Sequence, residues 1–184
     1  MLHPLRATQL SATIAVALLF AIGCSKKDSG PLDASGNPIG NTPRTTIPAQ
    51  YVGTWIAGTV SPTNFYNGNG GNWQNAYGNG MFYTLQADGT FEFGWQAYAN
   101  SYGCSTRGMV YRRGTAAASD STINLYDNVA RASGTDNCAP SGNYNRSIEL
   151  KTETIILRPA TDEYGNQGML IRNPDNNYSW FRPM

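Results

Sequence analysis

Aromatic and amide side chains concentrate between residues 61 and 80, and this segment offers the clearest chemistry in the chain. Its aromatic residues are Phe65, Tyr66, Trp73 and Tyr77, with glycine and asparagine at most positions between them. Flat aromatic rings stack on the C–H face of a sugar, while nearby amides hydrogen-bond its hydroxyls. The pattern predicts a glycan-binding loop. The alternative is a polar loop whose aromatic residues cover the mouth of a β-barrel.

Carboxylate pairs are the other candidates for chemistry. Glu149 and Glu153 flank a predicted turn, and Asp162 is followed by Glu163 in a loop. Two carboxyl groups about 5–9 Å apart can hydrolyse glycosides. Nothing in the sequence places either pair in a cleft, and solvated surface positions are the ordinary explanation. We therefore expect no catalytic residue and no enzymatic activity, with a carboxylate-based glycan hydrolase as the least favoured alternative.

Residues 1–23 have the zones of an export signal. Arg6 is their only charged side chain, and the apolar or small run from Leu10 to Ile22 is too short to span a membrane as a helix. Because this run closes on Gly23 and then Cys24, it resembles the lipobox of bacterial lipoproteins. The resemblance implies a cleaved signal peptide over 1–23 and acyl chains such as palmitate on Cys24. An ordinary secretory signal or an uncut anchor helix are the alternatives.

The residues that follow the lipobox extend this resemblance. Residues 24–28 read Cys-Ser-Lys-Lys-Asp, which resembles the start of many lipoproteins of the Bacteroidota type. Most of those are exported to the outer membrane. The resemblance implies a lipid-anchored protein of the cell envelope, at the outer membrane, with membrane lipid as a partner. The leaflet stays open.

Histidine is missing from the expected mature chain. The one histidine, His3, lies within residues 1–23. The remaining chain therefore cannot build a Ser-His-Asp or Cys-His catalytic arrangement, nor a histidine-ligated zinc site. The segments 162–166 and 175–177 are rich in Asp and Asn but lack the EF-hand spacing, so we predict turns there. We expect no metal and no cofactor.

Two cysteines remain once Cys24 is assigned to lipid. Cys104 and Cys138 form an even pair in an oxidising compartment. A hairpin that turns at Asp120 places them opposite each other, since they lie 16 and 18 residues from the turn. We predict a Cys104–Cys138 disulfide between the two strands or their extensions. Two buried thiols or a thiolate nucleophile are the alternatives, and Arg107 is the only basic residue close by in sequence.

Charge argues against nucleic acid as a partner. One of the 13 basic residues, Arg6, and none of the 12 acidic residues lie in 1–23, so the mature chain is formally neutral. A nucleic-acid binder carries a clustered basic excess. The only basic pairs after the leader are Lys26-Lys27 and Arg112-Arg113, and we interpret the second as part of a solvated face.

The chain divides into a tether and one folded domain. Residues 24–50 are rich in Ser, Gly, Pro, Asn and Thr, and such a composition predicts a disordered tether behind the lipid. Residues 51–184 alternate aromatic or β-branched runs with turn signals, and no stretch shows a helical stripe. The clearest hairpin joins 81–86 to 90–97 through Asp88-Gly89. The other expected strands are 52–60, 108–117, 122–130, 146–151, 154–158, 168–172 and 178–182. About eight or nine short strands predict an all-β fold, either an antiparallel up-and-down barrel or a barrel-like sandwich.

Two short motifs carry a family resemblance over residues 51–184. Gly53-Thr54-Trp55 opens the domain, and a later strand ends in the residues Asp-Gly-Thr-Phe at 88–91. Together they resemble the lipocalin-like domains of bacterial lipoproteins. The resemblance implies that Trp55 plugs one end of the barrel and packs near an arginine from a late strand. Arg158, Arg172 and Arg182 are the candidates, and Arg182 is preferred.

These observations favour a non-enzymatic, lipid-anchored binding protein for a small apolar or glycan ligand. Trp95, on the aromatic face of the predicted hairpin, joins Phe65, Tyr66, Trp73 and Tyr77 as a candidate ligand-binding residue. The alternative is a structural or adhesion module that contacts a partner protein through its loops. A hollow barrel favours the first hypothesis, and a filled interior favours the second.

Overall fold

The computed structural model describes residues 42–63, 65–67, 72–73, 78–172 and 176–184. The predicted signal peptide, the lipid site Cys24 and residues 24–41 of the predicted tether lie outside the described residues, as does Tyr77. Neither of the short helices in the described part of the chain has the length and apolar character that a membrane span needs.

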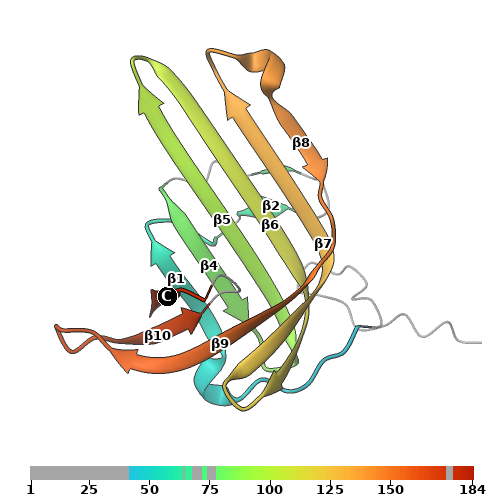
Figure 1. Ribbon diagram of the computed structural model, residues 1–184, viewed down its shortest axis with the longest axis vertical. Helices are drawn as coiled ribbons and strands as arrows, with labels where there is room; N and C mark the ends of the chain where they lie inside the picture. The colour runs from blue at the N-terminus through green and yellow to red at the C-terminus, as the bar shows by residue number, and fades with distance from the viewer. Residues whose placement is uncertain (1–41, 64, 68–71, 74–77, 173–175) are drawn as a thin grey trace, which may run out of the picture.

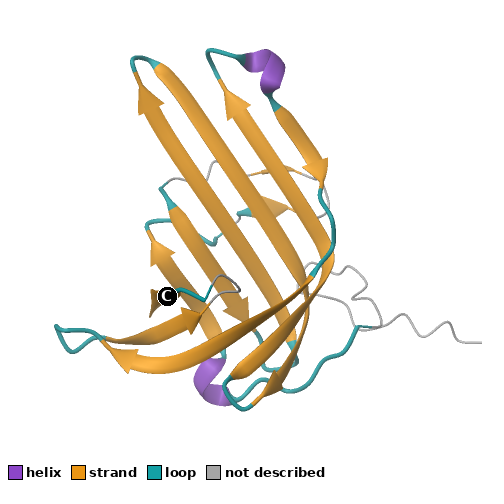
Figure 2. Cartoon of the chain, viewed as in Figure 1, coloured by secondary structure: helices purple, strands orange, loops and turns teal. Residues whose placement is uncertain are grey.

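The described residues form β-strands and two short 3-10 helices (Figure 2). The helices are η1 (Ala49–Tyr51) and η2 (Pro140–Gly142). The strands are β1 (Gly53–Gly58), β2 (Tyr66–Asn67), β3 (Asn72–Trp73), β4 (Gly80–Leu85), β5 (Thr90–Ser101), β6 (Cys104–Ser119), β7 (Thr122–Asp136), β8 (Tyr144–Ser147), β9 (Thr152–Thr161), β10 (Gln167–Arg172) and β11 (Tyr178–Pro183).

Nine of these strands form one antiparallel sheet in the order β6-β5-β4-β1-β11-β10-β9-β7-β8, and β6 also pairs with β7. Eight strands therefore close into a ring, with β8 attached outside it along β7. Neighbours in the ring follow each other in the chain, apart from the excursions through β2–β3 and β8. The predicted all-β, antiparallel, up-and-down architecture is confirmed. Trp55 of β1 pairs with Pro183 of β11 where the ring closes.

Local sequence explains the β4–β5 hairpin. The Asp88 carboxylate accepts hydrogen bonds from the backbone N–H and the hydroxyl of Thr90, and Gly89 takes a positive φ of 80°. These are the requirements of a tight turn. Phe91 and Phe93 pack with the interior cluster, and Trp95 shares their face because side chains alternate along a strand. The hairpin predicted from Asp88-Gly89 is confirmed.

Strands β5, β6 and β7 run well beyond the ring and, with β8, form a four-stranded extension (Figure 1). The strands predicted over 90–97, 108–117 and 122–130 are thus longer than expected. The strand predicted over 146–151 begins at Tyr144 and ends at Ser147 instead. The reason lies in the edge of β7 that faces away from β6. Strand β9 pairs with that edge only from Thr122 to Tyr126, and β8 pairs with it from Arg131 to Gly134.

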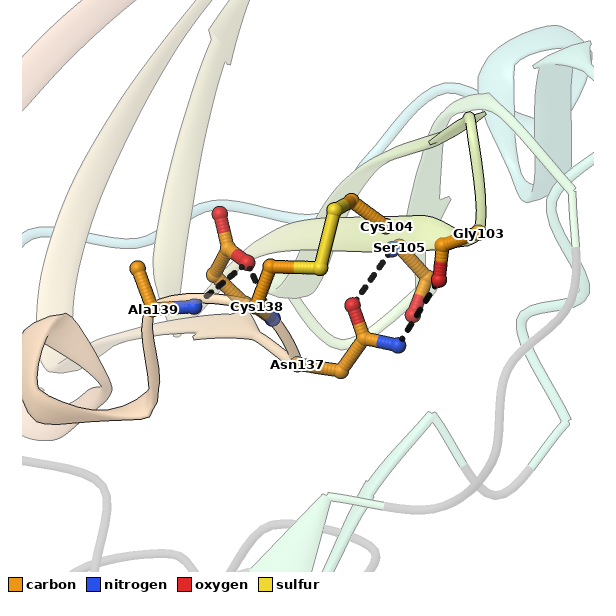
Figure 3. The surroundings of a disulfide bond; sticks show 7 residues. Gly103, Cys104, Ser105, Asn137, Cys138 and Ala139 are labelled. Carbon is orange, nitrogen blue, oxygen red and sulfur yellow. Dashed lines mark hydrogen bonds between the residues drawn. A yellow bond between two sulfur atoms is a disulfide. The ribbon is translucent and has the colours of Figure 1, made fainter.

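The predicted disulfide closes the tip of this extension. Cys104 at the start of β6 is bonded to Cys138, two residues after the end of β7, with their Cα atoms 5.5 Å apart (Figure 3). The Asn137 side chain accepts a hydrogen bond from the backbone N–H of Ser105 and donates one to the Gly103 carbonyl. The Asn137 side chain, next to Cys138, is therefore hydrogen-bonded to the backbone on either side of Cys104.

The inward side chains of the ring fill its interior. The core cluster joins residues from the ring strands with the segment before β1, and it includes Tyr83, Leu85, Phe91, Ile123, Leu125, Ile155, Leu157, Met169, Ile171 and Phe181. Most of them are less than 3% exposed. Such packing leaves side chains, not a ligand, as the main content of this part of the ring.

The folded domain starts earlier than the expected boundary at residue 50. Ile47 is 2% exposed within the core cluster, and its backbone N–H donates to the Ala87 carbonyl. Thr45 donates from its backbone N–H to Ala116, and the Thr115 hydroxyl contacts Pro43. Residues 42–50 therefore belong to the domain. Their polar composition predicts a tether, but Ile47 is buried and several backbone groups of the segment are hydrogen-bonded to the ring strands and the turns between them.

Candidate functional site

The segment predicted to bind glycans packs against the outer wall of the ring. Phe65, 2% exposed, clusters with Ile56, Phe82 and Met109, which point outward from β1, β4 and β6. Its ring meets that of Phe82 edge-on, with centroids 5.2 Å apart. The described part of the segment thus covers a wall, and the alternative in which it covers the mouth is wrong for these residues. Phe65 acts as core.

A glycine in β5 makes this packing possible. Gly94 lies between outward positions of β4 and β6, and a Cβ added there would clash with the Phe82 ring and lie 3.0 Å from the Phe65 ring. Without a side chain at 94, both rings settle directly on the sheet. The sequence pattern gave no sign of this, because Gly94 interrupts a strand whose other positions alternate regularly.

The four described aromatic residues of the proposed binding set do not converge. Tyr66 and Trp73 lie together on the outer wall, with ring centroids 5.0 Å apart. Trp95 lies on the other face of β5, where its indole covers Gly108. Tyr77 lies outside the described residues. Of the four described aromatic residues, Tyr66 and Trp73 therefore lie near a common concave surface.

That surface is a cleft of about 410 Å³ between Tyr66 and the edge formed by β7, β8 and the residues that follow β8. Tyr66 forms one side, and its ring packs on Tyr111 with centroids 4.7 Å apart. Polar groups come from Arg113, Asn128, Arg131 and Ser147. Val129, Ala130, Ile148 and Leu150 supply apolar surface, and Leu150 is 54% exposed. An aromatic wall with a few converging polar groups is typical of small-ligand sites.

Arg131 is held at the edge of this cleft by neutral oxygens. Its guanidinium donates to the Ser147 hydroxyl at 3.1 Å and to the Asn145 side-chain oxygen at 3.2 Å. The same Asn145 oxygen accepts a hydrogen bond from the Trp73 indole at 3.1 Å. One chain of hydrogen bonds therefore joins the 61–80 segment to β8 across the face of β7.

Consecutive arginines in β6 point to opposite faces. Arg113 lines the outer cleft and lies directly across the β5–β6 register from Glu92. Arg112 points into the ring. They are 8% and 3% exposed, respectively. The expectation of a solvated basic face at this pair is wrong, because a strand in a closed sheet that is covered outside by the 61–80 segment has no solvated side.

Arg112 is the centre of an ion cluster inside the ring. It contacts Asp127, with N–O distances of 2.8 and 3.0 Å, and it also forms an ion pair with Glu153. Burial lowers the pKa of the guanidinium, but the hydrogen bonds to both carboxylates and the attraction of their negative charges together raise it by more, so the group stays charged. Burial also raises the pKa of the Tyr83 phenol, and Glu153 raises it further. No pattern in the sequence indicates this cluster.

The carboxylates considered for hydrolysis lie in different environments. Glu153 belongs to the interior cluster, whereas Glu149 is exposed before β9. Asp162 closes the β9–β10 turn by accepting hydrogen bonds from the backbone N–H groups of Tyr164 and Asn166. The side-chain hydrogen bond from Asn166 lowers the pKa of Asp162. The described geometry assigns each of these three groups a separate local role.

The lipocalin-like motif is realised only in part. Trp55 packs against the core cluster, and its indole donates to the Tyr51 carbonyl at 2.9 Å, so it caps the interior beside η1. Arg182 is exposed on the outer face of β11, beside Trp180 in a second pocket of about 460 Å³. The expected packing of Arg182 near Trp55 is wrong. Phe181 takes the inward position, so its neighbour Arg182 points outward.

Comparison with protein-family models, curated proteins and solved structures finds no match for this chain. Among the described residues, no group of three or more His, Cys, Asp or Glu side chains is placed to hold a metal ion. Any functional assignment therefore depends on the geometry of the outer cleft and of the ring interior.

Proposed function

We propose that this protein is a non-enzymatic carbohydrate-binding module of the cell envelope, held there by lipid on Cys24. The observation that supports it best is the outer cleft. It combines the Tyr66 ring with amide, hydroxyl and guanidinium donors in about 410 Å³. A sugar ring presents C–H groups on its faces and hydroxyls on its rim, and this lining suits both.

The ring interior argues against an apolar ligand held as in a hollow barrel. Phe91, Leu125, Ile155 and Phe181 are all 2% exposed or less and pack in one cluster. A ligand inside this part of the ring would have to displace them. The up-and-down topology supports the lipocalin-like resemblance, but the proposed ligand binds at the outer wall of the ring and not in its interior.

A glycan array followed by titration calorimetry tests the proposal. We expect Tyr66→Ala to weaken binding of the best glycan about tenfold, because an aromatic contact contributes roughly 0.5–1.5 kcal/mol beyond its buried area. Tyr178→Ala is the matched control. Tyr178 is 38% exposed on the wall formed by β9–β11, so its loss should leave the affinity unchanged. Absence of any glycan ligand for the wild type would reject the proposal.

A second candidate function is a structural or adhesion module that contacts a partner protein. The filled interior favours it, because a ring packed with its own side chains needs no small ligand to be stable. The array separates the two candidates: a protein that binds no glycan but is retained by an envelope protein partner fits the adhesion module.

The proposed lipid anchor has its own test. Cys24→Ser is expected to abolish labelling by a palmitate analogue in cells and to release the protein from the membrane fraction, since several acyl chains are needed for lasting attachment. The Cys104→Ser/Cys138→Ser double variant is the control and should still be labelled. Continued labelling of Cys24→Ser would place the lipid elsewhere or disprove it.

A further inference from the structure

We infer that the outer cleft selects an acidic sugar and that Arg131 binds its carboxylate. This inference rests on the proposed carbohydrate-binding function and specifies its ligand class as a hexuronate or a similar carboxylate-bearing sugar. Three observations support it: the charge balance of the cleft, the way in which Arg131 is held, and the position of the aromatic wall.

The first observation is an uncompensated positive charge. The described residues that line the cleft include Arg113 and Arg131 but no acidic side chain. Arg113 has the Glu92 carboxylate directly across the β5–β6 register. For Arg131 the described partners are the neutral oxygens of Ser147 and Asn145. A half-buried guanidinium without a carboxylate partner leaves a net positive potential in the cleft, which favours an anion.

The second observation is that Arg131 is fixed in place. A guanidinium has five N–H donors, and two of those of Arg131 are used on β8 at 3.1 and 3.2 Å. Its Nε is buried and has no hydrogen-bond partner among the described residues. The Arg131 guanidinium is thus held against β8 by two N–H groups, and β8 does not use its other N–H donors. Pre-organised guanidinium donors bind carboxylates with fixed geometry, and they do so more strongly than neutral donors.

The third observation is that an aromatic ring and a neutral donor lie within the same cleft. Tyr66 forms one wall and is supported from behind by Tyr111. Asn128 and Ser147 add an amide and a hydroxyl. A pyranose with a carboxylate at one carbon can rest its C–H face on Tyr66 while the carboxylate reaches Arg131. A bare anion would use the arginine but leave the aromatic wall without a role.

The test is an NMR titration of the full mature domain with glucuronate, with glucose and with inorganic sulfate, followed through the Arg131 Nε–H signal and the Tyr66 ring signals. We expect glucuronate to shift both sets of signals and to bind at least tenfold more tightly than glucose. Arg131→Gln should lose that preference, so that the variant binds glucuronate no more tightly than it binds glucose. Arg146→Gln is the matched control, because it removes a charge from the neighbouring strand β8, on the opposite face of the sheet, where Arg146 packs over Tyr144.

These outcomes distinguish failure of the acidic-sugar inference from failure of the proposed carbohydrate-binding function. Equal affinity for glucose and glucuronate, or an unchanged preference in Arg131→Gln, overturns the acidic-sugar inference and leaves the carbohydrate function standing. Sulfate binding as tightly as glucuronate overturns the acidic-sugar inference, and the absence of any Tyr66 shift with both glucuronate and glucose overturns the proposed carbohydrate function as well. A preference lost equally in Arg146→Gln shows a general charge effect and also overturns the role of Arg131.

Discussion

Replacing Arg112 with methionine is expected to lower the free energy of unfolding by about 3–5 kcal/mol. Arg112 is 3% exposed and is the cation between the Asp127 and Glu153 carboxylates. Methionine nearly preserves the length of the aliphatic stem, so the main change is the loss of charge and hydrogen bonds. Two carboxylates then lie inside the ring without the guanidinium, and the largely exposed Lys151 ammonium, 3.3 Å from Glu153, stays beside them. Removing one partner is the costly way to break a buried ion pair. Urea unfolding followed by tryptophan fluorescence measures the effect.

Two further variants identify the cause of this loss. Arg107→Met removes a less buried arginine from the same strand, one that packs over the Tyr98 ring, and should cost no more than about 0.5 kcal/mol. Adding Asp127→Asn and Glu153→Gln to Arg112→Met should recover part of the lost stability, because the two buried negative charges are then gone. Equal effects for Arg112→Met and Arg107→Met would refute a role for the interior charge cluster.

Removing the disulfide with Cys104→Ala/Cys138→Ala is expected to cost about 3–4 kcal/mol by the chain-entropy model, because the bridge closes a loop with a sequence separation of 34 residues. The loss should show first at the tip of the extension. Ser105 and Cys138 donate backbone N–H groups to side chains beside the bridge, and these amides should exchange with solvent much faster in the variant. Hydrogen exchange read by mass spectrometry provides the measurement.

Wild-type protein reduced with dithiothreitol is the control for this second prediction. It should match the double variant in both unfolding free energy and exchange at the tip, since the bridge is the only difference that reduction makes among the described residues. Core amides of β4 and β10, which lie in the ring, should change less. A variant as stable as the oxidised wild type would show that the extension holds itself together through β5–β8 pairing alone.

Much of the strand pattern was predictable because it depends on local chemistry. The Asp88-Gly89 turn and the alternation of Phe91 and Phe93 specify a hairpin within a few residues. The Cys104–Cys138 pairing also followed from a single hairpin that turns at Asp120, a residue with a φ of +53°. Each of these features is decided between neighbouring strands, so no knowledge of ring closure was required.

The extent of the domain and the lengths of its strands were harder to predict from the sequence. Ile47 packs into the core from a segment whose composition resembles a tether. Strands β5, β6 and β7 continue past their apolar stretches because they pair with one another and with β8. Backbone hydrogen bonding between long strands needs no apolar alternation, and the sequence pattern therefore underestimates it.

By itself, the sequence determined an all-β chain of antiparallel hairpins with one disulfide, because turn chemistry, side-chain alternation and cysteine number act over short distances. Only the tertiary structure decided which side chains meet. Arg112 and Arg113 are adjacent in the chain, yet one enters an ion cluster and the other lines a cleft. Trp95 and Tyr66 are both aromatic, yet the sheet separates them. Which face of a strand is buried, and against what, depends on ring closure and on the packing of a distant segment, and neither is encoded within a local window.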